Sequence, residues 1–203
     1  MSTISAEQVQ KLRERTGAGM MDCKKALTEN SGDFDKAVDY LRKKGIASAA
    51  KKAGRATKEG SVSCYIHGEG RVGVLVEVNC ETDFVARTEQ FKTFVRDIAM
   101  HIAAANPLYV TPEQVPADVV AKEKEIAIAQ MQAQNKPAAV LEKIAEGKIQ
   151  KFFEENCLLK QGFIKNPDQK IEDLLKETIA SLGENIAIRR FSKFVLGEGV
   201  DGE

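Results

Sequence analysis

The sequence has little of what marks disulfide-rich, metal-binding or membrane-spanning chains. Its 203 residues include 4 cysteines and 2 histidines, with no CxxC pair and no spacing of these residues that is typical of a zinc site. No stretch approaches the ~20 apolar residues needed to span a bilayer. Residues 1–7 lack the basic start and apolar run of a secretory signal. We therefore expect a cytoplasmic protein that needs no metal, cofactor or membrane, with reduced cysteines in small core positions.

The chain also lacks an excess of either charge. Lysine plus arginine and aspartate plus glutamate both number 30, so the formal net charge is zero, whereas a dedicated nucleic-acid binder usually has a basic excess. The exception is the stretch 42–58, which carries seven basic residues and no acidic one. Such a run can contact nucleic acid or an acidic protein, but it is more often a solvated face. The overall balance predicts no direct requirement for nucleic acid.

Motifs of common enzyme classes are absent too. There is no phosphate-binding GxxxxGK[ST] and no GxSxG, and Gly68, Gly70 and Gly73 lie in a predicted hairpin instead of before a helix. A thiol nucleophile would need Cys80 beside His67. These two residues lie at opposite ends of the predicted hairpin, about 30 Å apart at the usual rise of a strand. Catalysis is therefore not expected, although a thiol enzyme using Cys80 stands as a rival hypothesis.

Three short helical patterns occupy the first part of the chain. Ser5 and a glutamine three residues later form a capping box at the start of the first helix, and Asp33 can cap the third. The third helix is expected to end before Gly45. The stretch 46–57, rich in alanine and lysine, is expected to be a helical or partly helical connector. Together these segments predict a small three-helix domain over 1–55.

From residue 61 the apolar period changes from helical to two, which predicts strands. Alternation over 61–67, a Gly-rich turn and alternation over 72–78 indicate a β-hairpin with one apolar face. The side chains assigned to that face are Val62, Cys64, Ile66, Val72, Val74, Val76 and Val78. Helices are predicted around 91–102, 117–134, 137–153 and 171–182, followed by a strand-like segment over 186–196. Few strands among many helices predict an α+β domain over 56–203, with a small antiparallel sheet covered by helices.

The corner after the second strand is the most unusual local feature. Phe84, a large apolar residue, follows the carboxylate of Asp83 at a place that should lie near the surface. Spacing alone favours folding of Phe84 and Val85 into the core, as a staple for the next helix, over an exposed contact. His67 beside the Gly-rich tip is equally consistent with contact and with solubility. His101, among apolar helix neighbours, is more often a structural, hydrogen-bonded residue.

Two long motifs resemble signatures of the elongation factor Ts family. The first is LRERTGAGMMDCKKAL at 12–27, and the second is EVNCETDFVA at 77–86. The shorter GENI at 183–186 and LGEG at 196–199 also fit, so the similarity runs over essentially the whole chain. The resemblance implies an N-terminal three-helix domain like ubiquitin-associated modules, followed by an α+β core.

The same resemblance implies a function and a partner. Members of this family are guanine nucleotide exchange factors in translation elongation: they bind the GDP form of the GTPase elongation factor Tu, release GDP and allow GTP to rebind. Exchange follows from binding linkage, so no catalytic residue is implied. The carried-over magnesium-dislocating residues, here called the wedge segment, are Thr82, Asp83, Phe84 and Val85, with Asp83 as polar anchor and Phe84 as wedge. The carried-over partner contacts are Leu12, Met20, Met21, Lys24 and His67.

One departure from longer family members bears on assembly. Those members carry two versions of the core subdomain, whereas this chain has a single hairpin and a single wedge segment. Short members resemble half of that arrangement and form homodimers. The resemblance therefore implies a homodimer in which one GTPase can contact both subunits. A nucleic-acid or ribosome-binding module using 42–58 is the remaining rival hypothesis.

Overall fold

The computed structural model describes residues 4–132 and 138–199, which fall into two compact units. The first unit combines the chain up to Val62 with Glu77–Val95 and Asp173–Ile188, and the second combines Ser63–Val76, Arg96–Glu172 and the chain from Arg189 onward. Helices and a small antiparallel sheet of three strands confirm the predicted α+β class. None of the helices in the described stretches is both long enough and apolar enough to cross a bilayer.

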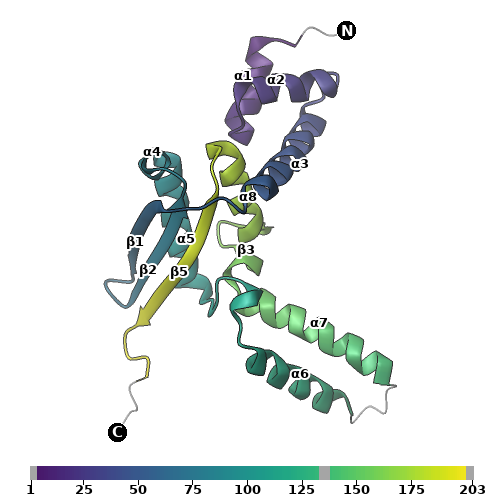
Figure 1. The fold of residues 1–203 in the computed structure, drawn as a ribbon, viewed down its shortest axis with the longest axis vertical. Helices are drawn as coiled ribbons and strands as arrows, with labels where there is room; N and C mark the ends of the chain where they lie inside the picture. Colours follow the sequence, from purple (N-terminus) through teal and green to yellow (C-terminus); the bar gives the residue numbers. More distant parts are fainter. Residues whose placement is uncertain (1–3, 133–137, 200–203) are drawn as a thin grey trace. The chain divides into compact units, whose positions relative to one another are not determined.

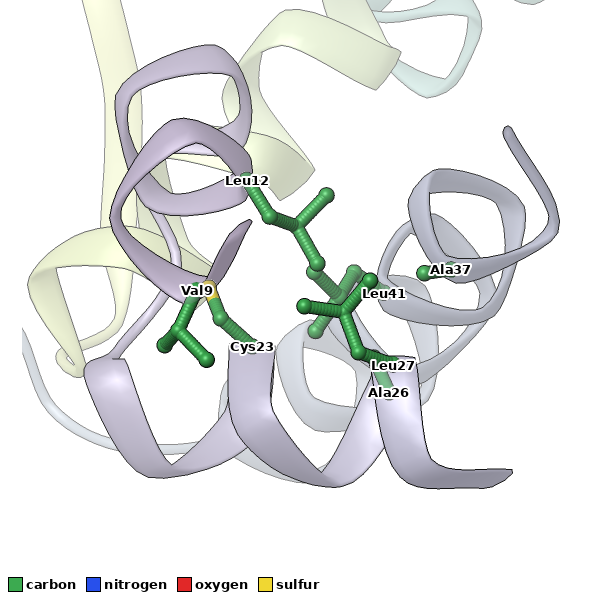
Figure 2. Packing of buried hydrophobic residues seen from close by; sticks show 7 residues of the cluster. All are labelled: Val9, Leu12, Cys23, Ala26, Leu27, Ala37 and Leu41. Atoms are coloured by element: carbon green, nitrogen blue, oxygen red, sulfur yellow. The ribbon is translucent and has the colours of Figure 1, made fainter. Parts of the chain in front are cut away.

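The three N-terminal helices form with the predicted caps. They are α1 (Ala6–Thr16), α2 (Met20–Glu29) and α3 (Phe34–Lys52). The Ser5 hydroxyl accepts a hydrogen bond from the Gln8 backbone N–H at 3.2 Å, and the Gln8 side chain accepts one from the Ser5 N–H at 2.9 Å. Asp33 caps α3 by accepting a bond from the Lys36 N–H at 3.1 Å. Figure 2 shows the core between these helices, formed by Val9, Leu12, Cys23, Ala26, Leu27, Ala37 and Leu41.

Gly45 lies inside α3, so the predicted end of this helix is wrong. A Cβ atom at Gly45 would lie 3.1 Å from the Cβ of Ala180 in α8 (Ile171–Leu182), closer than ordinary van der Waals contact. Glycine therefore allows the two helices to approach without displacing Ala180, and this close approach accounts for a residue that costs roughly 1 kcal/mol in helix propensity. The predicted connector is confirmed as partly helical, because α3 continues through it to Lys52.

The sheet has three strands, one of which lies between the other two. Its order is β1 (Glu59–His67), β2 (Val72–Cys80) and β5 (Ile186–Val195), as Figure 1 shows. The central strand β2 buries Val74, Val76, Val78 and Cys80, which alternate along the strand and so share one face. The position of β2 between two neighbours explains why its apolar row is the best buried of the three.

The apolar side chains of β1 lie on the other face of the sheet. Val62, Cys64 and Ile66 are exposed, and Ile66 Cδ1 lies 3.4 Å from the position that a Cβ of Gly73 would occupy. Gly73 precedes the buried Val74, so Ile66 stands on the face turned away from the buried row. The prediction of one shared apolar face is therefore wrong for β1, because this edge strand pairs with β2 in the opposite phase.

Cysteine burial follows the prediction at three of the four positions. Cys23, Cys80 and Cys157 are buried free thiols, and burial raises the pKa of each. Cys64 is exposed because it belongs to the outer row of β1. The expected use of cysteine as a small core residue is thus confirmed except at Cys64.

The remaining elements belong to both units, with their residues up to Val95 in the first unit and those from Arg96 in the second. They are α4 (Asp83–Ala86), α5 (Glu89–Ala105), η1 (Pro112–Gln114), α6 (Ala117–Gln132), α7 (Ala138–Asn156), η2 (Leu158–Lys160), β3 (Gly162–Phe163) and β4 (Asn166–Lys170). Helices α6 and α7 lie side by side as an antiparallel pair (Figure 1). The predicted helices around 117–134 and 137–153 are observed as this pair. The predicted end over 133–134 and the predicted start at Pro137 lie outside the described residues.

His101 is a buried structural residue of α5, as predicted. Its Nδ1 accepts a hydrogen bond from the Ile164 N–H at 3.3 Å, so the neutral ring can donate from Nε2 to Gln161 Oε1 at 3.0 Å. The Gln161 amide in turn donates to the carbonyls of Glu155 at 2.7 Å and Ala105 at 3.4 Å. Burial lowers the pKa of His101, although the bond to Gln161 acts in the opposite direction. The neutral ring therefore links α5 to the segment that follows α7.

Candidate protein-contact site

The corner between β2 and α4 turns within two residues. Strand β2 ends at Cys80 and α4 begins at Asp83. Thr82 caps the new helix, since its hydroxyl oxygen accepts a hydrogen bond from the Val85 N–H at 3.4 Å. The carboxylate of Asp83 pairs with Arg87 one turn later at 2.8 Å. Polar contacts therefore define the start and the exposed side of this short helix.

Phe84 projects from this corner into solvent. Its side chain is 78% exposed, and none of the four residues of α4 is buried. Its packing into the core, which spacing alone favoured, is therefore wrong. An exposed phenylalanine forgoes roughly 2–3 kcal/mol of burial free energy. A single exposed apolar residue is common on protein surfaces, but its place on a hydrogen-bonded corner makes Phe84 a candidate for contact with another protein.

A network of carboxylates fixes the corner to the loop before β5. Glu184 Oε2 accepts hydrogen bonds from the backbone N–H groups of Glu81 at 3.1 Å and Thr82 at 3.0 Å, and Glu184 Oε1 accepts one from the Thr82 hydroxyl at 2.6 Å. In the reverse direction, Glu81 Oε1 accepts a bond from the Asn185 N–H at 2.6 Å. The guanidinium of Arg55 lies 3.4 Å from the same oxygen. The Asn185 N–H, with a smaller contribution from Arg55, lowers the pKa of Glu81.

Sequence reasoning assigned no role to Glu184. Its partners at 81–82 lie about one hundred positions earlier in the chain. A contact between residues so far apart leaves no local pattern in the sequence. The only sequence signal was the motif at 183–186, which marks the loop without showing what it touches. The structure brings this loop and the wedge segment together.

The N-terminal contact residues divide into exposed and buried members. Met20 is 47% exposed and Met21 is 75% exposed at the start of α2, and Lys24 one turn later is also exposed. Leu12 is fully buried in the three-helix core. In the chain by itself Leu12 therefore supports the helices that carry the methionines and does not reach the surface.

A groove and a chain of hydrogen bonds lie next to Met20. The groove is lined by Gln10, Arg13, Glu14, Gly17, Met20 and Gln90. The Gln90 amide donates to Ser181 Oγ at 2.7 Å, and Ser181 Oγ donates to the Gly17 carbonyl at 2.9 Å. These bonds connect the start of α5, α8 and the end of α1 within the first unit. The methionines and Phe84, whose helix directly precedes α5, thus belong to one compact body.

His67 lies at the exposed end of β1. Its Nδ1 is 3.1 Å from the Tyr65 hydroxyl, and the two rings stack with centroids 5.9 Å apart. The turn that follows uses residues with positive φ at Gly68, Glu69 and Gly70. His67 is therefore presented from a tight turn with Tyr65 limiting the rotation of its ring.

The outer face of the sheet carries a second exposed apolar surface. The Lys193 ammonium donates to the Ala103 carbonyl of α5 at 3.0 Å, on the side covered by this helix (Figure 1). Its neighbour Phe194 therefore points to the opposite side, where Ile66 stands. We call the exposed residues Cys64, Ile66, Leu75 and Phe194 the outer sheet face. An apolar strand face without cover is typical of a protein interface.

The environment of Cys80 does not suit a nucleophile. Its thiol is fully buried and donates to the Thr82 carbonyl at 3.1 Å, and burial raises its pKa. A nucleophilic cysteine needs an exposed site and a lowered pKa. Cys80 thus packs beneath the corner. Among the residues that the structure describes, no group of three histidine, cysteine, aspartate or glutamate side chains is arranged to hold a metal ion.

The basic run over 42–58 is partly used within the first unit. Arg42 pairs with Asp173 at 3.7 Å, Lys44 with Asp22 at 2.7 Å, and Arg55 with Glu81 at 3.4 Å. Lys52 donates to the Ser48 hydroxyl at 3.0 Å. The three carboxylate partners reduce the positive potential that the run presents to a polyanion. The geometry therefore favours a structural role for this run.

Fold and surfaces together define a class: an α+β protein with three N-terminal helices, which exposes apolar side chains at a hydrogen-bonded corner and on one sheet face. Comparison with known proteins gives the family. The family model for elongation factor TS matches residues 35–198. Elongation factor Ts of Caldanaerobacter subterraneus subsp. tengcongensis is 61% identical over 198 residues, which cover 98% of this chain and 99% of that protein. The chain belongs to the elongation factor Ts family.

Other relatives agree along nearly the whole length. Elongation factor Ts of Citrifermentans bemidjiense is 62% identical over 198 residues, covering 98% of this chain and 92% of the relative. Elongation factor Ts of Anaeromyxobacter sp. strain K is 63% identical over 201 residues, covering 99% and 92%. The match includes both the three helices and the corner that bears Phe84.

Proposed function

We propose that the chain is a guanine nucleotide exchange factor for elongation factor Tu in translation elongation. The observation that carries the proposal is the exposed side chain of Phe84 on a corner fixed by hydrogen bonds, in a chain of this family. The wedge segment enters the GDP-bound GTPase beside the nucleotide and disturbs the groups that hold magnesium and phosphates. GDP then leaves, and GTP binds in its place.

Binding linkage explains how such a factor acts without a catalytic group. A protein that binds the nucleotide-free GTPase more tightly than the GDP form must weaken GDP binding by the same factor. Each tenfold weakening requires about 1.4 kcal/mol of differential binding. Magnesium offsets the phosphate charge, so its displacement removes a large part of the nucleotide affinity. Burial of Phe84 supplies roughly 2–3 kcal/mol toward this distortion.

The contact residues have distinct parts in this proposal. Phe84 is the wedge and Asp83 its polar anchor, while Thr82 and Val85 shape the corner. Met20 and Met21 adapt their flexible thioethers to the apolar surface of the GTPase. The remaining assigned residues are Lys24 beside the methionines, His67 at the hairpin tip and Leu12, which holds the helices from the core.

We also propose a homodimer formed through the outer sheet face. Cys64, Ile66, Leu75 and Phe194 give a flat apolar surface on an extended sheet. Two such sheets packed face to face by a two-fold axis would cover both apolar rows at once. In this arrangement 56–203 is the dimerisation domain and 1–55 the N-terminal contact domain. One GTPase then meets the wedge segment and His67 of different subunits.

Release of labelled GDP from elongation factor Tu tests the proposed function. The chain should accelerate release strongly, in the cytoplasmic salt range and with no nucleic acid present. Lys51→Ala, in the basic run, and Cys80→Ala should change the rate little, which separates exchange from the nucleic-acid and thiol hypotheses. Absence of acceleration, or tight RNA binding that survives high salt, would overturn the proposal.

A further inference from the structure

We propose that Glu184 is a positioning residue for nucleotide exchange: its carboxylate holds the wedge segment in the orientation that projects Phe84. This inference rests on the proposed function. The residue touches neither nucleotide nor GTPase in this role, and acts through Thr82. The geometry that points to it is the convergence of three donors on one carboxylate, at 3.1, 3.0 and 2.6 Å.

The wedge segment needs an external support because its helix is very short. Helix α4 has four residues, none of them buried, whereas isolated helices in water need roughly 12–15 residues to be even marginally stable. The orientation of Phe84 is therefore not fixed by helix formation alone, and no residue of α4 is fully buried to anchor it. It depends on the polar contacts at the start of the helix, where Glu184 supplies the acceptors.

Glu184 also sets the hydrogen position that makes the cap of α4 work. The Thr82 hydroxyl has one hydrogen, which is donated to Glu184 Oε1 at 2.6 Å. A lone pair of the same oxygen is then free to accept the Val85 N–H at 3.4 Å. Without a side chain at 184 that holds the Thr82 hydroxyl, whether by accepting from it or by donating to its oxygen, the hydroxyl can rotate and the cap becomes one of several states. The carboxylate thus acts on the helix that carries Phe84 through a single hydroxyl.

The loop that carries Glu184 is itself fixed on both sides. Gly183 has φ of 80°, which favours glycine, and its N–H bonds to the Ile179 carbonyl at 3.0 Å to close α8. Asn185 on the other side donates its N–H to Glu81 and its side-chain amide to the Arg55 carbonyl at 2.8 Å. The carboxylate is therefore presented from a rigid position, and little entropy is lost when the corner meets its partner.

Three substitutions of Glu184 separate the effect of its hydrogen bonds from the effect of its charge. In Glu184→Gln the amide oxygen can accept both N–H groups while the amide nitrogen donates to the Thr82 hydroxyl, so the geometry is largely kept. Glu184→Ala removes all three acceptor contacts, and Glu184→Asp keeps the charge but is one methylene too short. Glu125→Ala, an exposed acidic position on α6, is the matched control for loss of charge.

Hydrogen exchange in the free chain gives the first readout and needs no GTPase. The amides of Glu81 and Thr82 should exchange about tenfold faster in Glu184→Ala and Glu184→Asp, and near the wild-type rate in Glu184→Gln and Glu125→Ala. Unchanged protection in Glu184→Ala overturns the proposal. If Glu184→Ala does not fold, the contrast between aspartate and glutamine decides: equal protection in both is the contrary result.

Labelled GDP release from elongation factor Tu gives the second readout. Glu184→Ala should lower the maximal release rate about tenfold while the concentration for half-maximal effect changes less than threefold, and Glu184→Gln should restore most of the rate. In a Phe84→Ala background, Glu184→Ala should add little further loss, because the wedge it positions is gone. Full additivity, or a normal rate in Glu184→Ala, contradicts positioning. A normal rate in Phe84→Ala instead contradicts the wedge and so the proposed function.

Discussion

Two exposed phenylalanines of this molecule lie on different kinds of secondary structure. Phe84 is 78% exposed on a four-residue helix, and its orientation depends on hydrogen bonds made by Glu184 and Thr82. Phe194 is 69% exposed on a ten-residue strand, among the apolar side chains of Ile66 and Leu75. The first is a single projecting group on polar supports, and the second is part of an exposed apolar face of the sheet.

This difference indicates two modes of association. A projecting aromatic side chain can enter a space between elements of a partner and leave again, because little of the surface around it is buried in the contact. A flat apolar face binds through area and suits a partner that stays. The comparison therefore supports the two proposals made above, a transient GTPase contact at the corner and a lasting subunit contact at the outer sheet face. Substitution of Phe84 should impair exchange and spare dimerisation, whereas substitution of Phe194 should weaken dimerisation and affect exchange only through loss of the second subunit.

The largest effect is expected from Phe84→Ala. This change should lower the maximal rate of GDP release about 100-fold, equivalent to about 2.7 kcal/mol, because truncation removes the buried area that drives the distortion. The mass measured by light scattering should stay that of the wild type. Since Phe84 contributes nothing to the core, thermal unfolding should be unchanged. A variant that folds and exchanges normally would show that the corner is not the point of action.

The next effect is expected from Phe194→Ala. In a two-fold interface each substitution counts twice, so a loss of about 1 kcal/mol per copy weakens dimerisation about 30-fold. Light scattering over a dilution series measures this shift. Leu108→Ala, at an apolar position outside the sheet that is also largely exposed, is the control and should leave the series unchanged. A wild-type chain that is monomeric at all working concentrations would remove the basis of the comparison.

Much of the fold could be predicted because its signals are local. The capping box at Ser5, the cap at Asp33 and the alternation of β2 act within a few residues, and all three appear in the structure. The errors occurred where a distant element decides. Gly45 lies inside a helix, close against Ala180 of α8, and Ile66 is exposed because of the phase in which β1 pairs with its neighbour.

The candidate site was predictable to a smaller extent. Residue types and spacing identified the corner at Phe84 but favoured its burial, since an exposed phenylalanine is costly unless a partner covers it. Only the motif resemblance favoured contact. Glu184 was not predicted, because hydrogen bonds between residues 81–82 and 184 leave no periodic trace in one sequence. Hydrogen bonds between residues far apart in the chain are thus the part of the site that is hardest to predict from a single sequence.

The smallest effect is expected from acid. It should weaken the contacts of His101 in the second unit and those of Glu81 at the corner at different pH values. Burial lowers the pKa of His101 below its ordinary value of 6.5, so the unfolded chain binds a proton that the folded chain does not. Stability of the second unit should therefore fall as pH drops below about 6.5. The lowered pKa of Glu81 has the other pattern: its stabilisation is complete above its ordinary 4.5 and is lost only as pH falls through the lowered value.

Hydrogen exchange at pH 7 and pH 5, corrected for intrinsic rates, checks this order. Amides around Gln161 and Ile164 should lose protection between these values, whereas those of Glu81 and Thr82 should keep theirs. His101→Gln should flatten the pH dependence of the first group whatever its effect on absolute stability, because the titrating ring is gone. An unchanged slope in that variant would place the acid response elsewhere. If the corner keeps its protection while the contacts of His101 lose theirs, the two parts of the molecule respond to acid through different titrating groups.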